Sequence, residues 1–250
     1  MPFTRAAFPA ILTSIAMLAC SAENPSPESL TRITPPPIPT LAPQPGSSVR
    51  VGGDLNATIT TTANGFRHGP SSIDTPLPDG YPAPTPPGAI DIKSYPSVRL
   101  AEVQGVSNPD RGMNDAFWPL FKHIKKHDIA MTAPVEMNYT SLADDNSPET
   151  WSMAFLYRTP DLNDTGAEGD VLVRDAAPVT VLSLGVRGDY GKSLVNEARK
   201  QLQSWLDQHP QWQPTGQWRA LYYNGPSLFW WNKWAEVQIP VCAPEAPSQP

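Results

Sequence analysis

Two histidines, His123 and His127, stand four residues apart, and either of them could ligate a metal ion. Residues at this spacing lie on the same side of a helix, and imidazole is a common ligand of iron and other transition metals. Both also stand among lysines near the expected end of a helix, where the helix dipole alone favours cationic side chains. This simpler explanation requires no metal. We therefore predict no metal site, with ligation of iron by His123 or His127 as the alternative.

Aromatic and cationic side chains could together hold a flat, apolar ligand that carries acidic groups. Phe117 and Phe121 lie one turn apart on the same expected helix and predict one wall. Residues 229–231 are all aromatic and predict another, because three successive residues of an extended segment cannot all point inward. The alternatives are core packing for the aromatics and a solvated helix face for the nearby lysines. These lysines are Lys122, Lys125 and Lys126.

Three glutamates are the candidates for a catalytic base, namely Glu102, Glu136 and Glu236. Each occupies an alternating position of an expected strand, where the ordinary explanation is a carboxylate that faces solvent. The chain shows no Ser/His/Asp order, no glycine-rich phosphate loop and no metalloprotease motif. The sequence therefore favours a binding protein over an enzyme.

The elements that must position these side chains follow from a repeat with an offset of 81 residues. Residues 90–100 and 171–181 both alternate apolar and polar side chains, which is the period of a half-buried strand. Each copy continues with an amphipathic helix and two strands, and two such units can pair their sheets into an α+β domain. The later strands are expected at residues 129–139, 151–158, 218–223 and 233–241. The helical stripes are Met113, Phe117, Leu120, Phe121 and Ile124, and Val195, Ala198, Leu202, Trp205 and Leu206.

Composition restricts the folded part to the C-terminal portion of the 250 residues. Of the 31 prolines, 15 lie between Pro25 and Pro87, whereas all eight tryptophans lie between Trp118 and Trp234. The formal net charge of −6 argues against a nucleic-acid partner, which usually requires a basic face. We predict a disordered proline-rich tether at 21–87, one domain at 88–242 with repeats at about 89–158 and 170–241, and a disordered tail at 243–250.

The first 20 residues predict export. Arg5 supplies a positive charge, and the apolar run that follows is too short for a permanent membrane helix. The segment Met-Leu-Ala-Cys at 17–20 resembles the bacterial lipobox, in which Cys20 becomes lipidated. This resemblance implies a protein of the cell envelope, anchored in a membrane and facing the periplasm, with ordinary signal cleavage near Ala22 as the alternative. Cys242, the other cysteine, is expected to be a buried and inert thiol.

Four segments of the expected domain resemble an exported bacterial member of the SOUL haem-binding family. They are Ile-Asp-Ile-Lys-Ser-Tyr-Pro at 90–96, Met-Thr-Ala-Pro-Val at 131–135, Tyr-Asn-Gly-Pro at 223–226 and the closing strand at 234–241. The resemblance implies a distorted β-barrel flanked by two helices, which is the fold shared with gyrase-inhibitor-like effector-binding domains. It also implies binding of haem or another porphyrin in a shallow hydrophobic groove beneath the first helix, beside the loop before the last strand.

The implied function is tetrapyrrole binding without an axial histidine, by a protein that is not an enzyme. Ser94 stands where some family members are proposed to use histidine, and Asn114 replaces an arginine of a haem-binding relative, with Arg111 one turn earlier. The alternatives on the same fold are a small-molecule hydrolase and a module that binds an effector or a protein partner. The expected binding residues are Met113, Phe117, Phe121, Lys122, Lys125, Tyr223, Asn224, Phe229, Trp230 and Trp231.

Overall fold

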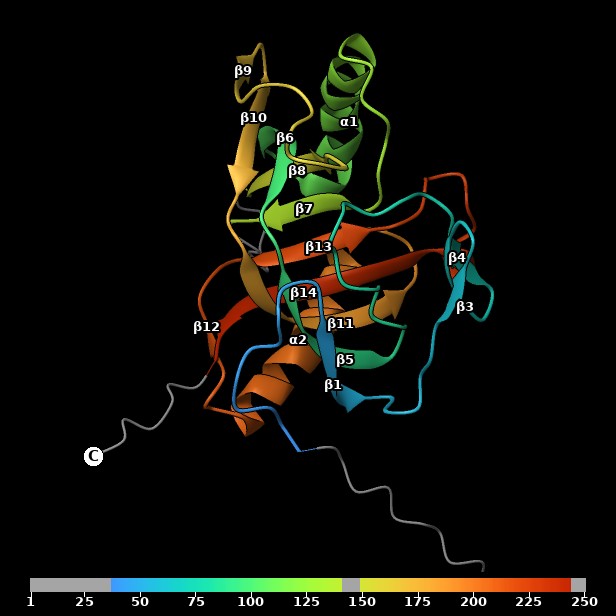
Figure 1. Cartoon of the computed structure of the whole chain (residues 1–250), viewed down its shortest axis with the longest axis vertical. Helices are drawn as coiled ribbons and strands as arrows, with labels where there is room; N and C mark the ends of the chain where they lie inside the picture. The colour runs from blue at the N-terminus through green and yellow to red at the C-terminus, as the bar shows by residue number, and fades with distance from the viewer. Residues whose placement is uncertain (1–36, 141–148, 244–250) are drawn as a thin grey trace, which may run out of the picture. The chain divides into compact units, whose positions relative to one another are not determined.

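The computed structural model describes residues 37–140 and 149–243 (Figure 1). The predicted export signal, Cys20, residues 21–36 of the predicted tether and residues 244–250 of the predicted tail lie outside these ranges. Across the ranges that are described, no helix combines the length and the apolar character needed to cross a membrane.

One large antiparallel sheet forms the centre of the domain (Figure 1). Its hydrogen-bonded order starts at β1 and finishes at β9, so the strands of the described ranges form an open sheet and not the closed barrel that the resemblance implied. In that order the strands are β1 (Ser48–Gly53), β5 (Ala89–Tyr95), β11 (Val179–Arg187), β14 (Trp234–Cys242), β13 (Trp218–Tyr222), β7 (Val135–Tyr139), β8 (Thr150–Leu156), β6 (Val98–Val106), β10 (Val171–Ala176) and β9 (Gly166–Glu168), with β12 (Gln213–Pro214) paired to β14.

The predicted repeat is confirmed, because β5, β6, the helix α1 (Pro109–Lys126), β7 and β8 recur in order as β10, β11, the helix α2 (Lys192–Gln208), β13 and β14. The first strand predicted in each copy is two strands, interrupted at Pro96 and at Pro178. The register is the same on both sides of the interruption, since Tyr95 pairs with Val179 and Val98 pairs with Ala176. Proline cannot donate to a strand ladder, so each long strand breaks there while its partner stays the same.

Two helices cover one face of the sheet, α1 (Pro109–Lys126) and α2 (Lys192–Gln208). The Asn108 side chain caps α1 by accepting from the Asp110 amide at 2.9 Å, and Pro109 fits the first turn because its missing N–H is not needed there. Asp110 also accepts a hydrogen bond from the Lys192 amide at 2.8 Å, so one carboxylate joins the N-terminal ends of both helices. The predicted stripe of α2 is wholly buried, at Val195, Ala198, Leu202, Trp205 and Leu206.

The prediction of a disordered tether is wrong for residues 37–87. Within this segment β1 pairs with β5, and β2 (Thr60–Thr62), β3 (Gly65–His68) and β4 (Ser71–Ile73) form a separate small sheet. Ile73 and Thr85 are fully buried against the face of the large sheet that the helices leave free. The segment packs here because β1 pairs with β5 and because the backbone of Thr85 bonds to the side chains of Glu236 and Trp234. The prediction of a buried thiol is also wrong, since Cys242 is exposed.

Candidate ligand-binding surfaces

Three aromatic rings form a continuous surface along one flank of α1. Phe117 and Phe121 stack with centroids 5.6 Å apart and planes 14° apart, and Trp118 meets both edge-on at 5.6 and 6.2 Å. Phe117 also packs against Phe155 of β8 at 5.4 Å, which anchors the surface to the core. The two phenylalanines are half-buried, whereas Trp118 is 59% exposed. Part of the aromatic surface is therefore not used for packing in the core and is accessible to a flat ligand.

Cationic side chains border this aromatic surface. The Lys125 ammonium lies 5.7 Å from the centroid of the Phe121 ring, and Lys122 is exposed on the same helix. Arg111 is exposed near the start of α1, whereas Met113 is half-buried against the core. The helix thus carries Lys122 and Lys125 together with the predicted aromatic wall, whereas the third predicted cation, Lys126, pairs with Glu168.

The predicted residues of the loop before β14 fall into two kinds. Tyr223 is buried and donates to the Glu236 carboxylate at 2.6 Å, and Asn224 joins the loop to Ser72 and to the Trp234 amide, both at 2.7 Å. These two side chains therefore hold the loop in place. Beyond them, exposed aromatics surround the 3-10 turn η1 (Trp230–Asn232), with Phe229 66%, Trp230 54% and Trp231 44% exposed.

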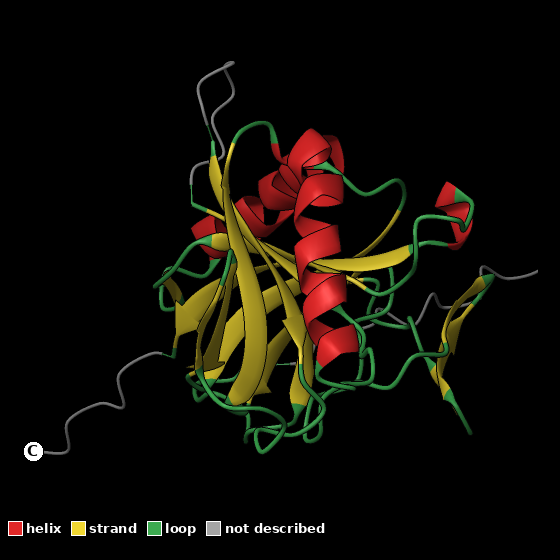
Figure 2. Cartoon of the chain, turned by 90° about the horizontal axis from the view of Figure 1, so that it is seen from above, coloured by secondary structure: helices red, strands yellow, loops and turns green. Residues whose placement is uncertain are grey.

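The structure places the loop aromatics away from the aromatic flank of α1. The turn η1 lies beside β4 and β11, and Figure 2 shows it next to the small three-stranded sheet and apart from both long helices. Phe229 and Trp231 stack on each other with centroids 4.7 Å apart. The two predicted walls therefore form separate surfaces, and a single groove between them is not what the structure shows.

Two grooves of similar volume contain neither aromatic surface. A groove of about 610 Å³ lies beneath the opposite flank of α1, between Ala116 and Trp151, and its ionisable side chains are Glu102, Asp115 and Asp170. The other, of about 630 Å³, crosses strands β6, β8, β7 and β13. Its charged residues form two ion pairs, Arg174 with Glu102 and Arg219 with Glu136. Neither groove combines apolar walls with free cations.

The three glutamates predicted to face solvent are all buried. Glu102 accepts hydrogen bonds from Ser152 at 2.6 Å and Arg174 at 2.8 Å, whereas Glu236 accepts from the fully buried Lys93 at 2.9 Å. Burial alone would raise the pKa of Glu236, but Lys93 and the Ser183 and Tyr223 hydroxyls hold it below its ordinary value. The pKa of Glu102 is likewise lowered, by Arg174 and Ser152 against burial. Carboxylates held ionised in this way are weak proton acceptors.

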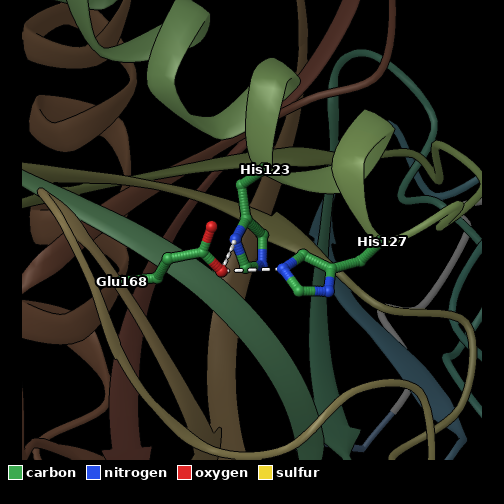
Figure 3. Close-up of side chains that lie close together, drawn as sticks. All are labelled: His123, His127 and Glu168. Atoms are coloured by element: carbon green, nitrogen blue, oxygen red, sulfur yellow. Dashed lines mark hydrogen bonds and ion pairs between the residues drawn. The ribbon is translucent and has the colours of Figure 1, made fainter.

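His123 and His127 converge on one carboxylate, that of Glu168 in β9 (Figure 3). Glu168 Oε2 lies 2.7 Å from His127 Nε2 and 3.3 Å from His123 Nδ1, while Oε1 accepts from Lys126 at 2.7 Å. His123 is buried, which lowers its pKa against the opposing effect of Glu168. Hydrogen bonds from Lys126 and His127 lower the pKa of Glu168 to about 2.

The histidines do not adjoin the aromatic surface. His123 follows Phe117 by six residues, which places it about 240° further around the helix. Its Nε2 instead lies 2.9 Å from the Tyr157 hydroxyl. Sequence reasoning did not identify Trp118, Tyr157 or Glu168. Trp118 lies only about 100° from Phe117 and could have been found by helical geometry, but Glu168 follows no apolar pattern that could have pointed to it.

The elements together define an α+β domain built from two strand–helix–strand–strand units, with an N-terminal segment packed on the sheet. The model of the SOUL heme-binding protein family matches residues 83–240. The chain belongs to this family, and its members are binding proteins. A search of curated protein sequences gave no significant match.

Solved structures with a similar fold share little sequence with this chain. The C-terminal domain of EcmrR is 16% identical with a TM-score of 0.52, and the match covers 61% of this chain and 96% of that domain. EcmrR in its complex with DNA gives the same identity, the same TM-score and the same coverage of this chain. The match spans 56% of that longer protein. An uncharacterised conserved protein from Listeria innocua is 14% identical with a TM-score of 0.49, over 63% of this chain and 94% of that one. The likeness to EcmrR supports the fold alone.

Proposed function

We propose that this protein binds haem or a related tetrapyrrole on the aromatic flank of α1. The observation that carries the proposal is the three-ring surface of Phe117, Trp118 and Phe121, bordered by Lys122 and Lys125. A porphyrin is a flat apolar plate with two carboxylates on one edge, and this flank supplies rings for the plate and ammonium groups for the edge. The groove on the opposite flank is lined by carboxylates, which would repel that edge.

The proposed binding uses no axial histidine. Ser94, at the position where some family members are proposed to use histidine, is buried and bonds to the Thr180 hydroxyl at 2.8 Å. His123 and His127 are engaged by Tyr157 and Glu168 on another side of α1. Ring stacking and charge pairing therefore supply the affinity, and the iron is dispensable to binding.

Titration of the full chain with haemin tests this proposal. We expect a saturable shift of the Soret band, and a similar affinity for the iron-free porphyrin. Trp118→Ala should weaken binding by roughly 3- to 10-fold, because one stacking partner is lost. Combined replacement of Lys122 and Lys125 by alanine should weaken haemin binding further. High salt should weaken haemin binding by the unaltered chain in the same way, because it screens these charges.

Trp230→Ala is the matched control, because Trp230 is about as exposed as Trp118, at 54% against 59%. Equal loss in the two tryptophan variants would count against a site confined to the aromatic flank of α1, because the loop at 229–231 forms a separate surface. Loss in Trp230→Ala alone would move the site to that loop, and no binding at micromolar haemin would exclude the proposal.

We also propose that the protein is exported and lipid-anchored through Cys20. This proposal is supported by the apolar run of the first 20 residues and by the lipobox-like segment at 17–20. Labelled palmitate should be incorporated by cells that express the full chain and not by cells that express Cys20→Ala. Release of the unaltered protein into the soluble periplasmic fraction would refute the anchor.

No catalytic role is proposed for Glu102, Glu136 or Glu236, because each is already paired with a buried or half-buried cation. A carboxylate that accepts a substrate proton must be free of such a partner and within reach of the substrate. The pairing of these carboxylates agrees with a binding protein, which is also what membership of the SOUL family indicates.

A further inference from the structure

We propose that His123, His127 and Glu168 bind one divalent transition-metal ion of the zinc and cobalt class. The inference is independent of tetrapyrrole binding, because it concerns other side chains on another side of α1. Two imidazole nitrogens and one carboxylate oxygen lie within 4.8 Å of one another, drawn from α1 and from β9 (Figure 3).

The two separations to Glu168 Oε2 lie at or below those around a coordinated ion, and the two imidazole nitrogens lie within 4.8 Å of each other. Tetrahedral coordination with bonds of about 2.0–2.2 Å separates neighbouring ligand atoms by roughly 3.3–3.6 Å. Glu168 Oε2 is 3.3 Å from His123 Nδ1 and 2.7 Å from His127 Nε2. Only the more exposed side chains must move to admit an ion, since His127 is 26% and Glu168 38% exposed.

His123 Nδ1 is the atom that most clearly indicates a ligand. This nitrogen is buried and, among the residues that the structure describes, has no hydrogen-bond partner in suitable geometry. It faces Glu168 Oε2, the same oxygen that contacts His127. A buried polar atom without a hydrogen bond is costly in a protein, and a metal ion between the three side chains would bind it.

Tyr157 supplies the outer contact that metal-binding histidines commonly have. Its hydroxyl lies 2.9 Å from His123 Nε2. An imidazole that donates from Nε2 to this oxygen presents the lone pair of Nδ1 toward Glu168 and His127. Tyr157 is therefore a positioning residue that holds the ring of His123 in the tautomer that can bind a metal.

The donor set selects the class of ion. Imidazole nitrogens suit transition-metal ions such as zinc, iron, nickel and copper, whereas calcium and magnesium require mainly oxygen ligands. Three protein ligands leave a fourth position of a tetrahedron open, and the exposure of His127 and Glu168 allows water to occupy it. The Lys126 ammonium bonds to Glu168 Oε1 and leaves Oε2 for the ion.

Metal titration of the full chain tests the site. After treatment with chelator, the chain should bind one zinc ion by calorimetry, and cobalt should give the visible absorption of a tetrahedral site. His127→Ala and Glu168→Gln should each weaken zinc binding at least 10-fold and abolish the cobalt absorption. Both positions are partly exposed, so these variants should retain the circular dichroism of the unaltered chain.

His68→Ala is the matched control, because His68 bonds to the Thr58 carbonyl and stands outside the cluster. Its zinc affinity should equal that of the unaltered chain, and the titration is repeated with Cys242→Ser to exclude the exposed thiol as a ligand. Absence of the tetrahedral cobalt absorption, or equal zinc affinity in the unaltered chain and in His127→Ala and Glu168→Gln, would overturn the proposal.

Discussion

The buried pair of Lys93 and Glu236 shows what a sequence pattern can and cannot say about a single residue. Alternation correctly places Glu236 on the face of β14 opposite Val237, which packs in the cluster that contains both helices. It cannot say that this opposite face is covered. The Thr85 amide donates to Glu236 at 2.8 Å, so a segment predicted to be a tether closes the interior over the carboxylate.

Acid should destabilise the protein through its buried carboxylates. The pKa values of Glu236 and Glu102 are lowered in the folded state, so unfolded chains bind protons more readily. Their contribution to stability is therefore complete above about pH 4.5 and is lost as the pH falls through the lowered values. Urea unfolding at several pH values should show a free energy of unfolding that declines below about pH 4.5.

Substitution of Lys93 and Glu236 shows how much of the loss of stability in acid comes from this pair. Lys93→Met or Glu236→Gln alone should cost about 3–5 kcal/mol at neutral pH, because each leaves the other partner buried without its counterpart. The double variant should cost much less than the sum of the two. It should also lose less stability in acid, and an acid decline as steep as that of the unaltered chain would assign the effect to other groups.

Trp151 illustrates packing at the scale of elements. Its indole lies between β6 and α1, and a Cβ added at Gly105 or Gly112 would approach within 2.2 or 2.0 Å of the ring. Both glycines therefore allow helix and sheet to close on the tryptophan. The Trp151 N–H donates to the Ser107 carbonyl at 3.1 Å, which fixes the ring in that position.

Gly112→Ala should destabilise the protein by about 1–3 kcal/mol, because the added methyl displaces a buried ring. A destabilising effect is informative, since alanine in place of glycine within a helix ordinarily stabilises the protein by up to about 1 kcal/mol. Asn114→Ala, at an exposed position of the same helix, serves as control and should be neutral or slightly stabilising. Urea unfolding of both variants decides, and a stabilised Gly112→Ala would contradict the packing described.

The packing of segment 85–88 on the sheet should be disturbed by a single methyl group added at Gly185 of β11. Gly185 binds this segment through the Gly88 amide at 2.8 Å, and a Cβ there would meet the Pro86 and Thr85 carbonyl oxygens at 2.2 and 2.4 Å. Gly185→Ala should therefore displace the segment, lower the free energy of unfolding by about 1–3 kcal/mol and speed hydrogen exchange between residues 76 and 88. Gly225→Ala, where nothing lies within 4 Å, should do neither, and an unchanged exchange pattern in Gly185→Ala would count against the packing.

The sequence was most informative where a pattern repeats. The stripe from Val195 to Leu206 and the order of strands in both copies follow from periodicity, because burial on one side imposes the period of the element. Composition failed at residues 37–87, since this segment is held largely by backbone pairing of β1 and by polar contacts of Thr85, which composition does not measure. Glu168 was not found because contacts between distant segments leave no local pattern.

At the scale of the whole molecule, α1 has three faces with different tasks. Leu120 and Ile124 pack in the core, Phe117, Trp118 and Phe121 form the aromatic surface, and His123 and His127 contact β9 through Glu168. The second helix carries the buried stripe alone and offers no comparable aromatic flank among its described residues. The repeat therefore provides two similar scaffolds, of which the first is the one equipped for ligands.

Binding on the two flanks of α1 should be independent. The aromatic surface and the histidine cluster share no residue, and substitutions at separate sites usually add within about 0.3–0.5 kcal/mol. Haemin affinity should therefore stay within about two-fold in Glu168→Gln and in the presence of zinc, and Trp118→Ala should leave cobalt binding unchanged. Loss of the saturable Soret shift in His127→Ala would instead identify a histidine as an iron ligand. In that case stacking and charge alone would not hold the tetrapyrrole, and the metal site and the haem site would be one.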